Sequence, residues 1–253
     1  MIPVWGLVIS ASSVVAQFRR GFSTTSALTY PFPPRTAVIG IVGAILGANK
    51  KTREGTDLLK ELDEKLLVGV RWVRGRITTF GINNMYGKDE KGIKSILPGA
   101  AVWADQNGKG HIVHLPTPTE FVIHPEYEIT LLSRDKDLLE RIEHHVEERR
   151  MKYAPYLGVQ GALARLDIEV TVTAAERVES DSTTDYTVPE GSADVYPENN
   201  VFVAIFPRSR DYSDSLRKVT EYSKVYWTTP GKSVRIKPKG EVWEVDGRTV
   251  PAY

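Results

Sequence analysis

The spacing of hydrophobic positions along the chain predicts three helices. In residues 36–47, aliphatic side chains recur every three or four positions, as they do on one face of a helix. This segment follows Pro33-Pro34, and proline is favoured at the beginning of a helix. Residues 56–67 and 135–153 repeat their apolar side chains with the same period, so both are expected to be amphipathic helices.

Strands are predicted where valine and isoleucine alternate with polar residues. The resulting order is strand, helix, two long strands, helix and strand. This is the pattern of a ferredoxin-like domain of the α+β class, of which the RRM is an RNA-binding version. His124-Pro125 is expected to interrupt the third long strand. The predicted strands lie at residues 2–15, 68–82, 121–132 and 166–175, and shorter ones at 202–206, 218–227, 234–237 and 241–245.

These elements indicate two parts, a ferredoxin-like domain at residues 1–175 and a β-rich C-terminal lobe at residues 176–253. A long excursion at residues 83–110 is inserted between two strands of the first part. It is rich in glycine, asparagine and lysine, and Asn107-Gly108 is a hairpin signal. Loops of this length in a compact domain usually have a function of their own.

Composition is typical of a globular protein without thiol chemistry. Of the 253 residues, 41% are hydrophobic and 26% are charged, and there is no cysteine. This excludes disulfides, thiolate metal ligands and cysteine nucleophiles. The longest apolar stretch, residues 36–48, is shorter than the ~20 residues that a bilayer requires. A signal peptide has basic residues before its apolar part, and the apolar N-terminal segment has none there, so we expect no signal peptide. We expect a cytoplasmic protein with no cofactor and no metal site.

Charge is segregated along a chain that is nearly neutral overall. The 33 lysines and arginines balance 32 acidic residues, yet residues 1–53 contain six basic residues and no acidic one. Residues 71–109 and 208–239 are also basic, whereas residues 163–198 carry nine acidic side chains and two arginines. Such asymmetry favours one face adapted to a polyanion, while solvated clusters of like charge are the alternative.

Residues 18–47 have the composition of a site for single-stranded RNA. Aromatic residues are interspersed there with arginines, serines and threonines. Rings can stack on bases, guanidinium groups can pair with phosphate, and hydroxyls can bond to phosphate or to a 2′-hydroxyl. The segment leads into a helix N-terminus, which favours anions. Gly40, Gly43 and Gly47 form a stripe that indicates close approach by a sheet or by a ligand. The alternative is an aromatic loop that packs on its own core.

Three motifs point to one family. The sequence FRRGFSTTSALTYPFPPRTAVIGIVGAILG (residues 18–47) closely resembles the N-terminal signature of the fifth family of CRISPR-associated proteins, in the RAMP superfamily. Two further motifs, TEFVIHPEYEITL (residues 119–131) and KYAPYLGVQGALA (residues 152–164), match the same family in the same order. The resemblance covers the first two-thirds of the chain.

The resemblance implies a subunit of a type I CRISPR effector complex (Cascade), with a ferredoxin-like RAMP domain and a thumb at residues 83–110. Such subunits bind the repeat-derived 5′ handle of the CRISPR RNA and cap the base of the complex in antiviral defence, beside the backbone subunit and the large subunit. Tyr156 and Gly158 are expected to shape the fold. The expected RNA contacts are Arg19, Arg20, Tyr30, Arg35 and Thr36 for the handle, Arg71, Arg74 and Arg76 on the sheet, and Lys88, Lys91 and Lys94 on the thumb.

Two alternatives to this non-catalytic function are kept open. One branch of the family looks like a metal-independent endoribonuclease that processes precursor CRISPR RNA with a tyrosine and an adjacent lysine–histidine pair. The nearest equivalents are Tyr30, Lys109 and His111, but Gly110 separates the last two and would place them on one strand face. The second alternative is a scaffold that contacts only proteins through its basic segments.

Overall fold

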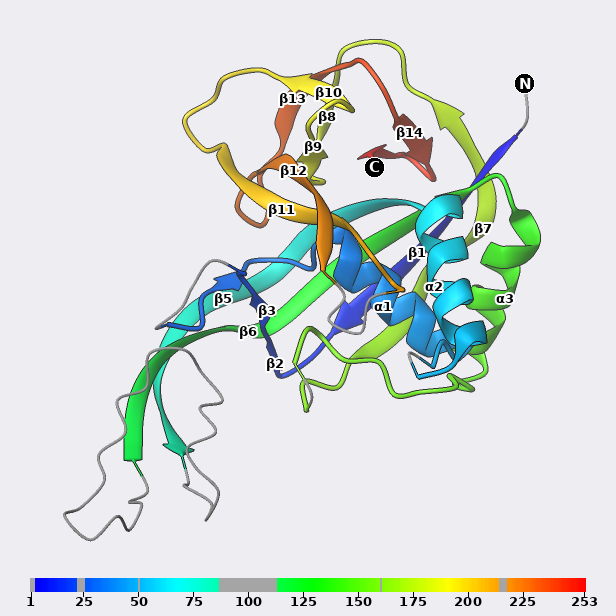
Figure 1. Cartoon of the computed structure of the whole chain (residues 1–253). Coiled ribbons are helices and arrows are strands. Elements are labelled where there is room, and N and C mark those ends of the chain that lie inside the picture. Colours follow the sequence, from blue (N-terminus) through cyan, green and yellow to red (C-terminus); the bar gives the residue numbers. More distant parts are fainter. Residues whose placement is uncertain (1–2, 22–25, 50, 87–112, 160, 214–217) are drawn as a thin grey trace, which may run out of the picture.

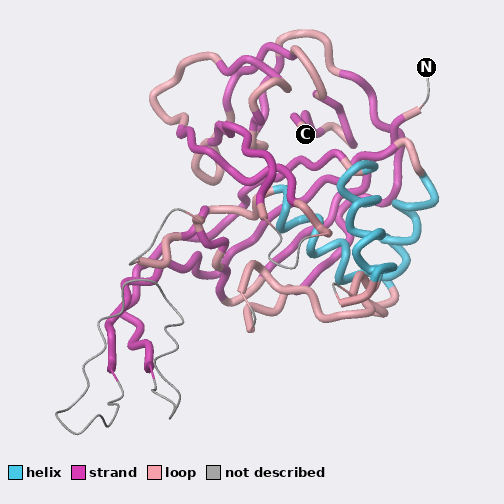
Figure 2. The backbone as a smooth tube through the Cα atoms, viewed as in Figure 1, coloured by secondary structure: helices cyan, strands magenta, loops and turns pink. Residues whose placement is uncertain are grey.

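The structure is a computed structural model that describes residues 3–21, 26–49, 51–86, 113–159, 161–213 and 218–253 (Figure 1). Over these residues the chain has a mixed α+β fold made mostly of antiparallel strands, with three helices (Figure 2). The predicted α+β class is therefore confirmed. None of the helices in these ranges is long and apolar enough to cross a membrane.

The main sheet joins strands from both ends of the chain. Its members are β1 (Val4–Ser12), β2 (Val15–Ala16), β5 (Leu67–Tyr86), β6 (Val113–Ser133), β7 (Arg165–Arg177), β14 (Val242–Val245) and β15 (Arg248–Pro251). Their order is β15-β14-β7-β1-β6-β2, and β5 pairs along β6. β1 is therefore central and antiparallel to both β6 and β7. Because β14 and β15 follow residue 176, the C-terminal segment completes the same sheet as the N-terminal one.

Smaller sheets cover one side of the main sheet and lie beside β6. Two three-stranded sheets have the orders β11-β12-β9 and β10-β13-β8, and β3 pairs with β4 in a short hairpin. In Figure 1 the two three-stranded sheets lie together above the main sheet, next to the C-terminus. These strands are β3 (Phe18–Arg19), β4 (Thr29–Tyr30), β8 (Ser182–Thr184), β9 (Val188–Pro189), β10 (Ala193–Val195), β11 (Phe202–Arg210), β12 (Val219–Trp227) and β13 (Val234–Pro238).

The three predicted helices are present as α1 (Arg35–Leu46), α2 (Arg53–Lys65) and α3 (Lys136–Glu147). The prediction extended the last helix too far, to residue 153. Arg149 has a φ of +54°, which ends helical geometry. The N–H groups of Lys152 and Tyr153 then donate to carbonyls at the end of α1 instead of continuing α3.

β1 separates two apolar clusters because its side chains alternate between the faces of the sheet. Leu7 and Ile9 point toward α1, α2 and α3, where apolar residues of all three helices are buried. Val4 and Val8 point to the opposite face, where β14 and β15 cover them. Burying each such side chain contributes roughly 1.5–3 kcal/mol, so the alternating pattern of β1 fixes both layers around it.

The glycine stripe of α1 is explained mainly by its neighbours in the fold. A methyl group at Gly43 would lie 2.7 Å from Cδ2 of Leu59 on α2, so glycine lets these two helices approach. Gly47 ends α1 with a φ of +93°, and its N–H donates to the Gly43 carbonyl. Gly40 differs from both, since a methyl group there would meet nothing within 4 Å.

β6 is one continuous strand, which corrects the predicted interruption at His124-Pro125. His124 has a φ of +47°, and the register between β5 and β6 shifts at this point, between Arg74 and Arg76. The extra residue is accommodated as a β-bulge, where a proline is tolerated because it has no N–H to donate. The His124 N–H donates to the Val14 carbonyl at 2.9 Å, so the bulge leaves that group satisfied.

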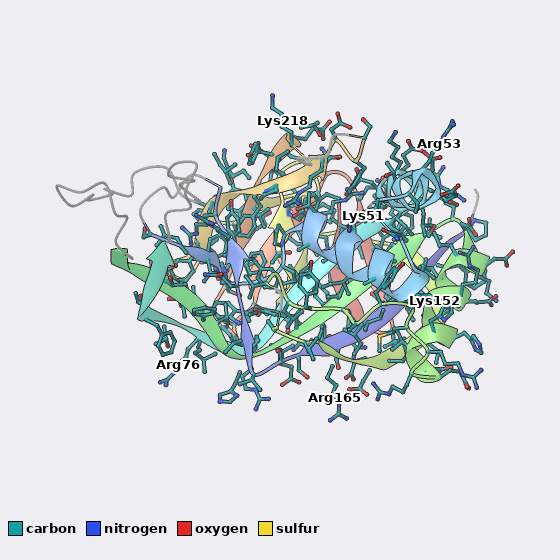
Figure 3. All side chains as sticks on the ribbon, turned by 60° about the horizontal axis from the view of Figure 1, so that its bottom comes forward. Lys51, Arg53, Arg76, Lys152, Arg165 and Lys218 are labelled. Atoms are coloured by element: carbon teal, nitrogen blue, oxygen red, sulfur yellow. The ribbon has the colours of Figure 1, made fainter. Side chains whose placement is uncertain are left out.

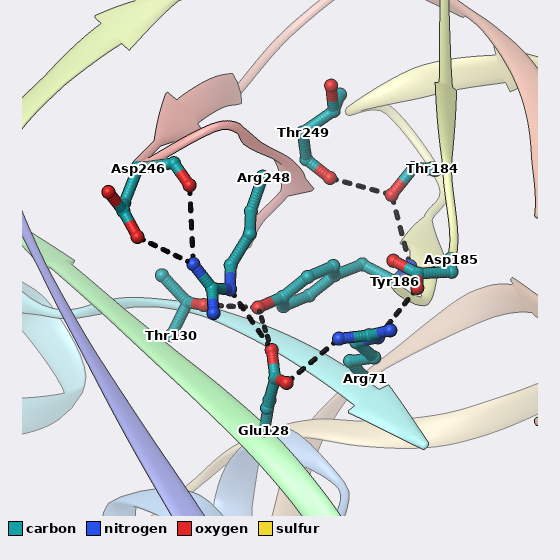
Figure 4. A network of polar contacts seen from close by, with 9 residues as sticks. All are labelled: Arg71, Glu128, Thr130, Thr184, Asp185, Tyr186, Asp246, Arg248 and Thr249. Carbon is teal, nitrogen blue, oxygen red and sulfur yellow. Dashed lines mark hydrogen bonds and ion pairs between the residues drawn. The ribbon is translucent and has the colours of Figure 1, made fainter. Parts of the chain in front are cut away.

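A buried polar network joins the main sheet to the C-terminal strands (Figure 4). Glu128 on β6 accepts hydrogen bonds from Arg71 of β5 at 2.8 Å and from Arg248 of β15 at 3.2 Å. The Tyr186 hydroxyl donates to the same carboxylate at 3.2 Å and accepts from Thr130 at 3.0 Å. Burial raises the pKa of Tyr186, so its hydroxyl remains a donor. One carboxylate therefore fixes three segments that are distant in the sequence.

This network predicts that Glu128→Gln destabilises the protein. The substitution keeps the shape but removes the charge that two arginines share, so we expect the free energy of unfolding to fall by about 1–3 kcal/mol. The matched control is Glu126→Gln, because Glu126 pairs with the exposed Arg74, and such pairs contribute about 0–1 kcal/mol. Urea unfolding monitored by circular dichroism measures both. Equal losses in the two variants would contradict the role given to Glu128.

Candidate functional site

A cleft of about 400 Å³ lies along α1, from Pro34 at its N-cap to Ala48 just beyond its end. The β3 strand, the segment that follows α3 and the end of β11 form its other walls. None of the described residues that line it is acidic, whereas arginines and tyrosines are present on its walls. The polar or aromatic side chains of the lining are Gln17, Phe18, Arg19, Thr36, Tyr153, Tyr156 and Arg210.

The two tyrosines are held at the cleft by backbone contacts on either side of them. The N–H of Tyr153 donates to the Ala44 carbonyl of α1 at 2.9 Å. Gly158 has a φ of +89°, and a methyl group there would collide with the backbone of Gln17, so only glycine allows this loop to pack against β2 and β3. Tyr153 and Tyr156 each retain 47% of their exposure. Their rings therefore remain accessible from the cleft.

Thr36 lies in the first turn of α1 and is 4% exposed. Its Oγ1 has no hydrogen-bond partner among the described residues. A buried hydroxyl without a partner costs about 1–3 kcal/mol, so the unbonded Thr36 hydroxyl lowers the stability of the free protein. Gly40, one turn further along α1, leaves open space on the same wall of the cleft.

Basic side chains extend the positive character beyond the cleft itself. Arg19 is exposed at its entrance, on β3. Figure 3 places Lys51 and Lys152 near α1 and shows Arg76 pointing outward at the base of the β5–β6 ribbon. Lys152 is fixed there because its N–H donates to the Ile45 carbonyl at 3.1 Å. The cleft and its surroundings thus favour an anionic ligand.

Arg35 does not lie where the sequence predicted it, because its guanidinium group is buried instead of facing solvent. The residue is 6% exposed and forms an ion pair with Asp63 of α2. It also donates to the carbonyls of Tyr253 and Leu66, each at 2.9 Å, and to that of Arg208 at 3.2 Å. Every direction of the guanidinium group is therefore occupied, and Arg35 has a structural role.

The aromatic rings of the N-terminal segment are likewise part of the core. Phe18, Tyr30 and Phe32 are each no more than 3% exposed. Tyr30 stacks on Phe206 with a centroid distance of 4.2 Å, and its hydroxyl donates to the Ile205 carbonyl at 2.9 Å. Burial raises the pKa of Tyr30, so its hydroxyl is a poor general base at neutral pH. For these three rings, the alternative prediction of an aromatic loop that packs on its own core is therefore the correct one.

The remaining predicted arginines fall into two groups. Arg20 is partly buried, donates to the Thr29 carbonyl at 3.0 Å and lies over the Tyr30 ring. Arg71 is held by Glu128 and Asp185. In contrast, Arg74 is 69% exposed beside Glu126, and Arg76 is exposed on the ribbon.

Five predicted residues lie outside the described part of the chain. Within the described ranges, no group of three or more histidine or acidic side chains is arranged to hold a metal ion. Lys109 and His111, the residues considered for an endoribonuclease, lie outside the described ranges, so their position relative to Tyr30 is not described. The residues outside the described ranges are Lys88, Lys91, Lys94, Lys109 and His111.

Sequence reasoning missed Tyr153 and Arg210, and it expected Tyr156 only to shape the fold. Tyr153 and Tyr156 flank a proline in the motif KYAPYLG, and exposed tyrosines next to a loop proline and glycine are the signal that was available. Gly158 does shape the fold, as its φ and its contact with Gln17 confirm. Arg210 carried no signal, since it lies in a strand far along the chain.

The model of the family described as CRISPR-associated protein (Cas_Cas5) matches residues 6–224. No curated protein matches the chain in sequence. A crystal structure of a CRISPR protein from Archaeoglobus fulgidus is similar over 97% of both chains, with 16% identity and a TM-score of 0.55. A chain of a CRISPR RNA-guided surveillance complex is similar over 92% of this chain and 91% of its own, with 14% identity and a TM-score of 0.53. These likenesses concern the fold.

The position of Arg35 predicts a large loss of stability in Arg35→Leu. The substitution leaves the Asp63 carboxylate without its cation and removes the donor to the carbonyls of Asp63, Leu66, Arg208 and Tyr253, so we expect the free energy of unfolding to fall by about 3–5 kcal/mol. The control Arg53→Leu removes a 92% exposed side chain from α2 and should cost less than about 1 kcal/mol. Chemical denaturation compares the two. A stable Arg35→Leu protein would contradict the structural role.

Proposed function

Because the chain belongs to the CRISPR-associated protein (Cas_Cas5) family, we propose that it is a non-catalytic subunit of a type I effector complex and binds the 5′ handle of the CRISPR RNA. The handle lies in the cleft beside α1. The observation that carries this proposal is the lining of the cleft. It combines Arg19 and Arg210 with two accessible tyrosines, and none of the described residues that line it is acidic.

The chemistry of the cleft suits a single strand better than a duplex. Tyr153 and Tyr156 offer rings on which unpaired bases can stack, and such stacking contributes about 1–3 kcal/mol per base. Guanidinium groups pair with the phosphates between stacked bases.

The remaining parts of the proposal concern architecture and neighbours. The strand order β7-β1-β6-β5 with helices on one face supports a ferredoxin-like RAMP domain. The ribbon of β5 and β6 projects from the body (Figure 1), which supports a thumb at residues 83–110 with RNA contacts from Lys88, Lys91 and Lys94. Arg74 and Arg76 lie on β5, the strand that leads toward this segment.

The chain would cap the base of the complex, next to the backbone subunit and the large subunit. Two observations support protein neighbours. A chain of similar fold comes from an RNA-guided surveillance complex. In addition, the β11 side chains Val203 and Ile205 lie on one face of the strand and are each about half exposed, and exposed apolar groups that lie together mark contact surfaces.

Endoribonuclease chemistry is the weaker proposal, because the described tyrosine is unsuited to it. A general base must reach the 2′-hydroxyl that it deprotonates, and the Tyr30 hydroxyl is bonded to a carbonyl in the interior. Incubation of the protein with repeat RNA in the presence of a chelator distinguishes RNA cleavage from RNA binding alone. A single defined cut would overturn the non-catalytic proposal, whereas intact RNA that is shifted in a gel supports it.

The proposed site predicts which substitutions weaken RNA binding. The test is co-expression with the neighbouring genes, sequencing of the co-purified RNA, and filter binding of the recovered 5′ end at several salt concentrations. Tyr153→Ala and Tyr156→Ala should each lower affinity by about 1–3 kcal/mol at an unchanged salt slope. Arg19→Gln should reduce the slope by about 0.7 for the phosphate that it no longer neutralises.

The control for these variants is Arg134→Gln, which removes an exposed arginine between β6 and α3, away from the cleft. It should leave affinity and salt slope unchanged within error. Equal losses in the control and in Arg19→Gln would show that only net charge matters and would contradict a localised site. Absence of any RNA binding at low salt would leave the protein-contacting scaffold.

A further inference from the structure

The N-terminus of α1 differs from those of the other helices in its lack of a side-chain cap. Pro34 occupies the N-cap position, no acidic residue lies in the first turn, and no side chain bonds to its N–H groups. The first N–H groups of a helix have no acceptor within the helix and carry partial positive charge. α2 and α3, in contrast, are capped by Thr52 and Asp135. The Ala37 N–H donates to the Pro34 carbonyl at 2.8 Å, so the N–H groups of Arg35 and Thr36 are the ones left for an anion from outside the described chain.

An independent observation at the same place also requires an external partner. The Thr36 hydroxyl is buried in the wall of the cleft and has no hydrogen-bond partner in the described chain. Native proteins satisfy most buried hydroxyls, and the exceptions are informative where a ligand can enter. Thr36 and the open face of Gly40 belong to the lining of the same cleft, so a ligand there lies next to this hydroxyl, which solvent does not reach in the free protein.

We propose that the first turn of α1 is a phosphate subsite, in which the Thr36 hydroxyl donates to one phosphodiester of the bound strand. This inference rests on the proposed function and assigns one linkage of the RNA to one residue of the chain. The phosphate lies at the positive end of α1. Arg19 and Arg210, which line the same cleft, add the charge that a phosphodiester requires.

Gly40 completes the subsite through its size. A side chain at this position would project into the cleft, where a methyl group now has nothing within 4 Å. With glycine, the sugar–phosphate backbone can pass along α1 without a steric barrier. The three features act together, since the helix end attracts the anion, Thr36 orients it and Gly40 leaves it room.

The experiment measures the affinity of wild-type protein and Thr36→Val for the recovered 5′-end RNA, synthesised with one uncharged methylphosphonate at each linkage in turn. In wild type, one linkage should be sensitive, and its replacement should weaken binding about tenfold or more, as expected for a hydrogen bond to a charged group. Thr36→Val should bind the unmodified RNA weaker by a similar factor. In Thr36→Val, a methylphosphonate at the sensitive linkage should therefore weaken binding by a smaller factor than it does in wild type.

Two controls separate a lost contact from a lost fold. Thr36→Ser keeps the hydroxyl and should retain the wild-type scan, whereas Thr171→Val, an exposed strand position on β7, should change nothing. The free energy of unfolding of Thr36→Val should be equal to or above that of wild type, because the substitution removes an unsatisfied buried group. A destabilised Thr36→Val protein would show that the hydroxyl has a structural partner and would overturn the subsite.

The outcomes distinguish this inference from the function on which it rests. RNA binding with identical scans in wild type and Thr36→Val overturns the subsite and leaves the RNA-binding function intact. If inorganic phosphate alone stabilises wild type but not Thr36→Val while the scans stay identical, the turn binds free phosphate, which also overturns a backbone subsite. Wild-type protein that binds no RNA overturns both.

Discussion

The buried guanidinium group of Arg35 is the constraint on which the rest of the structure depends. It joins the beginning of α1 to Asp63 on α2, to the Arg208 carbonyl on β11 and to the Tyr253 carbonyl. One side chain at the first position of α1 thus fixes three segments that are distant in the sequence. Because α1 forms a wall of the cleft, this anchor also determines where Thr36 and the helix end face.

The same anchor explains why the aromatic rings of the N-terminal segment are buried instead of facing solvent. Once α1 is held against α2 and β11, Tyr30 and Phe32 lie against Phe206 and complete the core. The accessible rings come instead from the segment after α3, where Tyr153 bonds to the backbone of α1. The N-terminal motif therefore builds much of the core beneath the cleft and contributes Arg19, Thr36 and Gly40 to its lining, whereas the exposed rings come from the segment after α3.

The helices and long strands could be predicted because their periodicity reflects burial on one face. The motifs also led to the right family, because they are local in sequence. Which arginine is exposed could not be predicted, since the fate of Arg35 depends on Asp63 and on carbonyls more than a hundred residues away. The continuity of β6 through His124 was missed for a related reason, because a bulge depends on the partner strand.

The central claim is that RNA lies along α1 between Arg19 and the tyrosines that follow α3. Ultraviolet crosslinking of the co-purified complex, followed by mass spectrometry of the crosslinked peptides, tests it most directly. Binding in this cleft predicts nucleotide adducts on Tyr153 or Tyr156 and none on Tyr30, which is 3% exposed. Adducts on Tyr30 or on the acidic strand β7, with Tyr153 and Tyr156 unmodified, would contradict it.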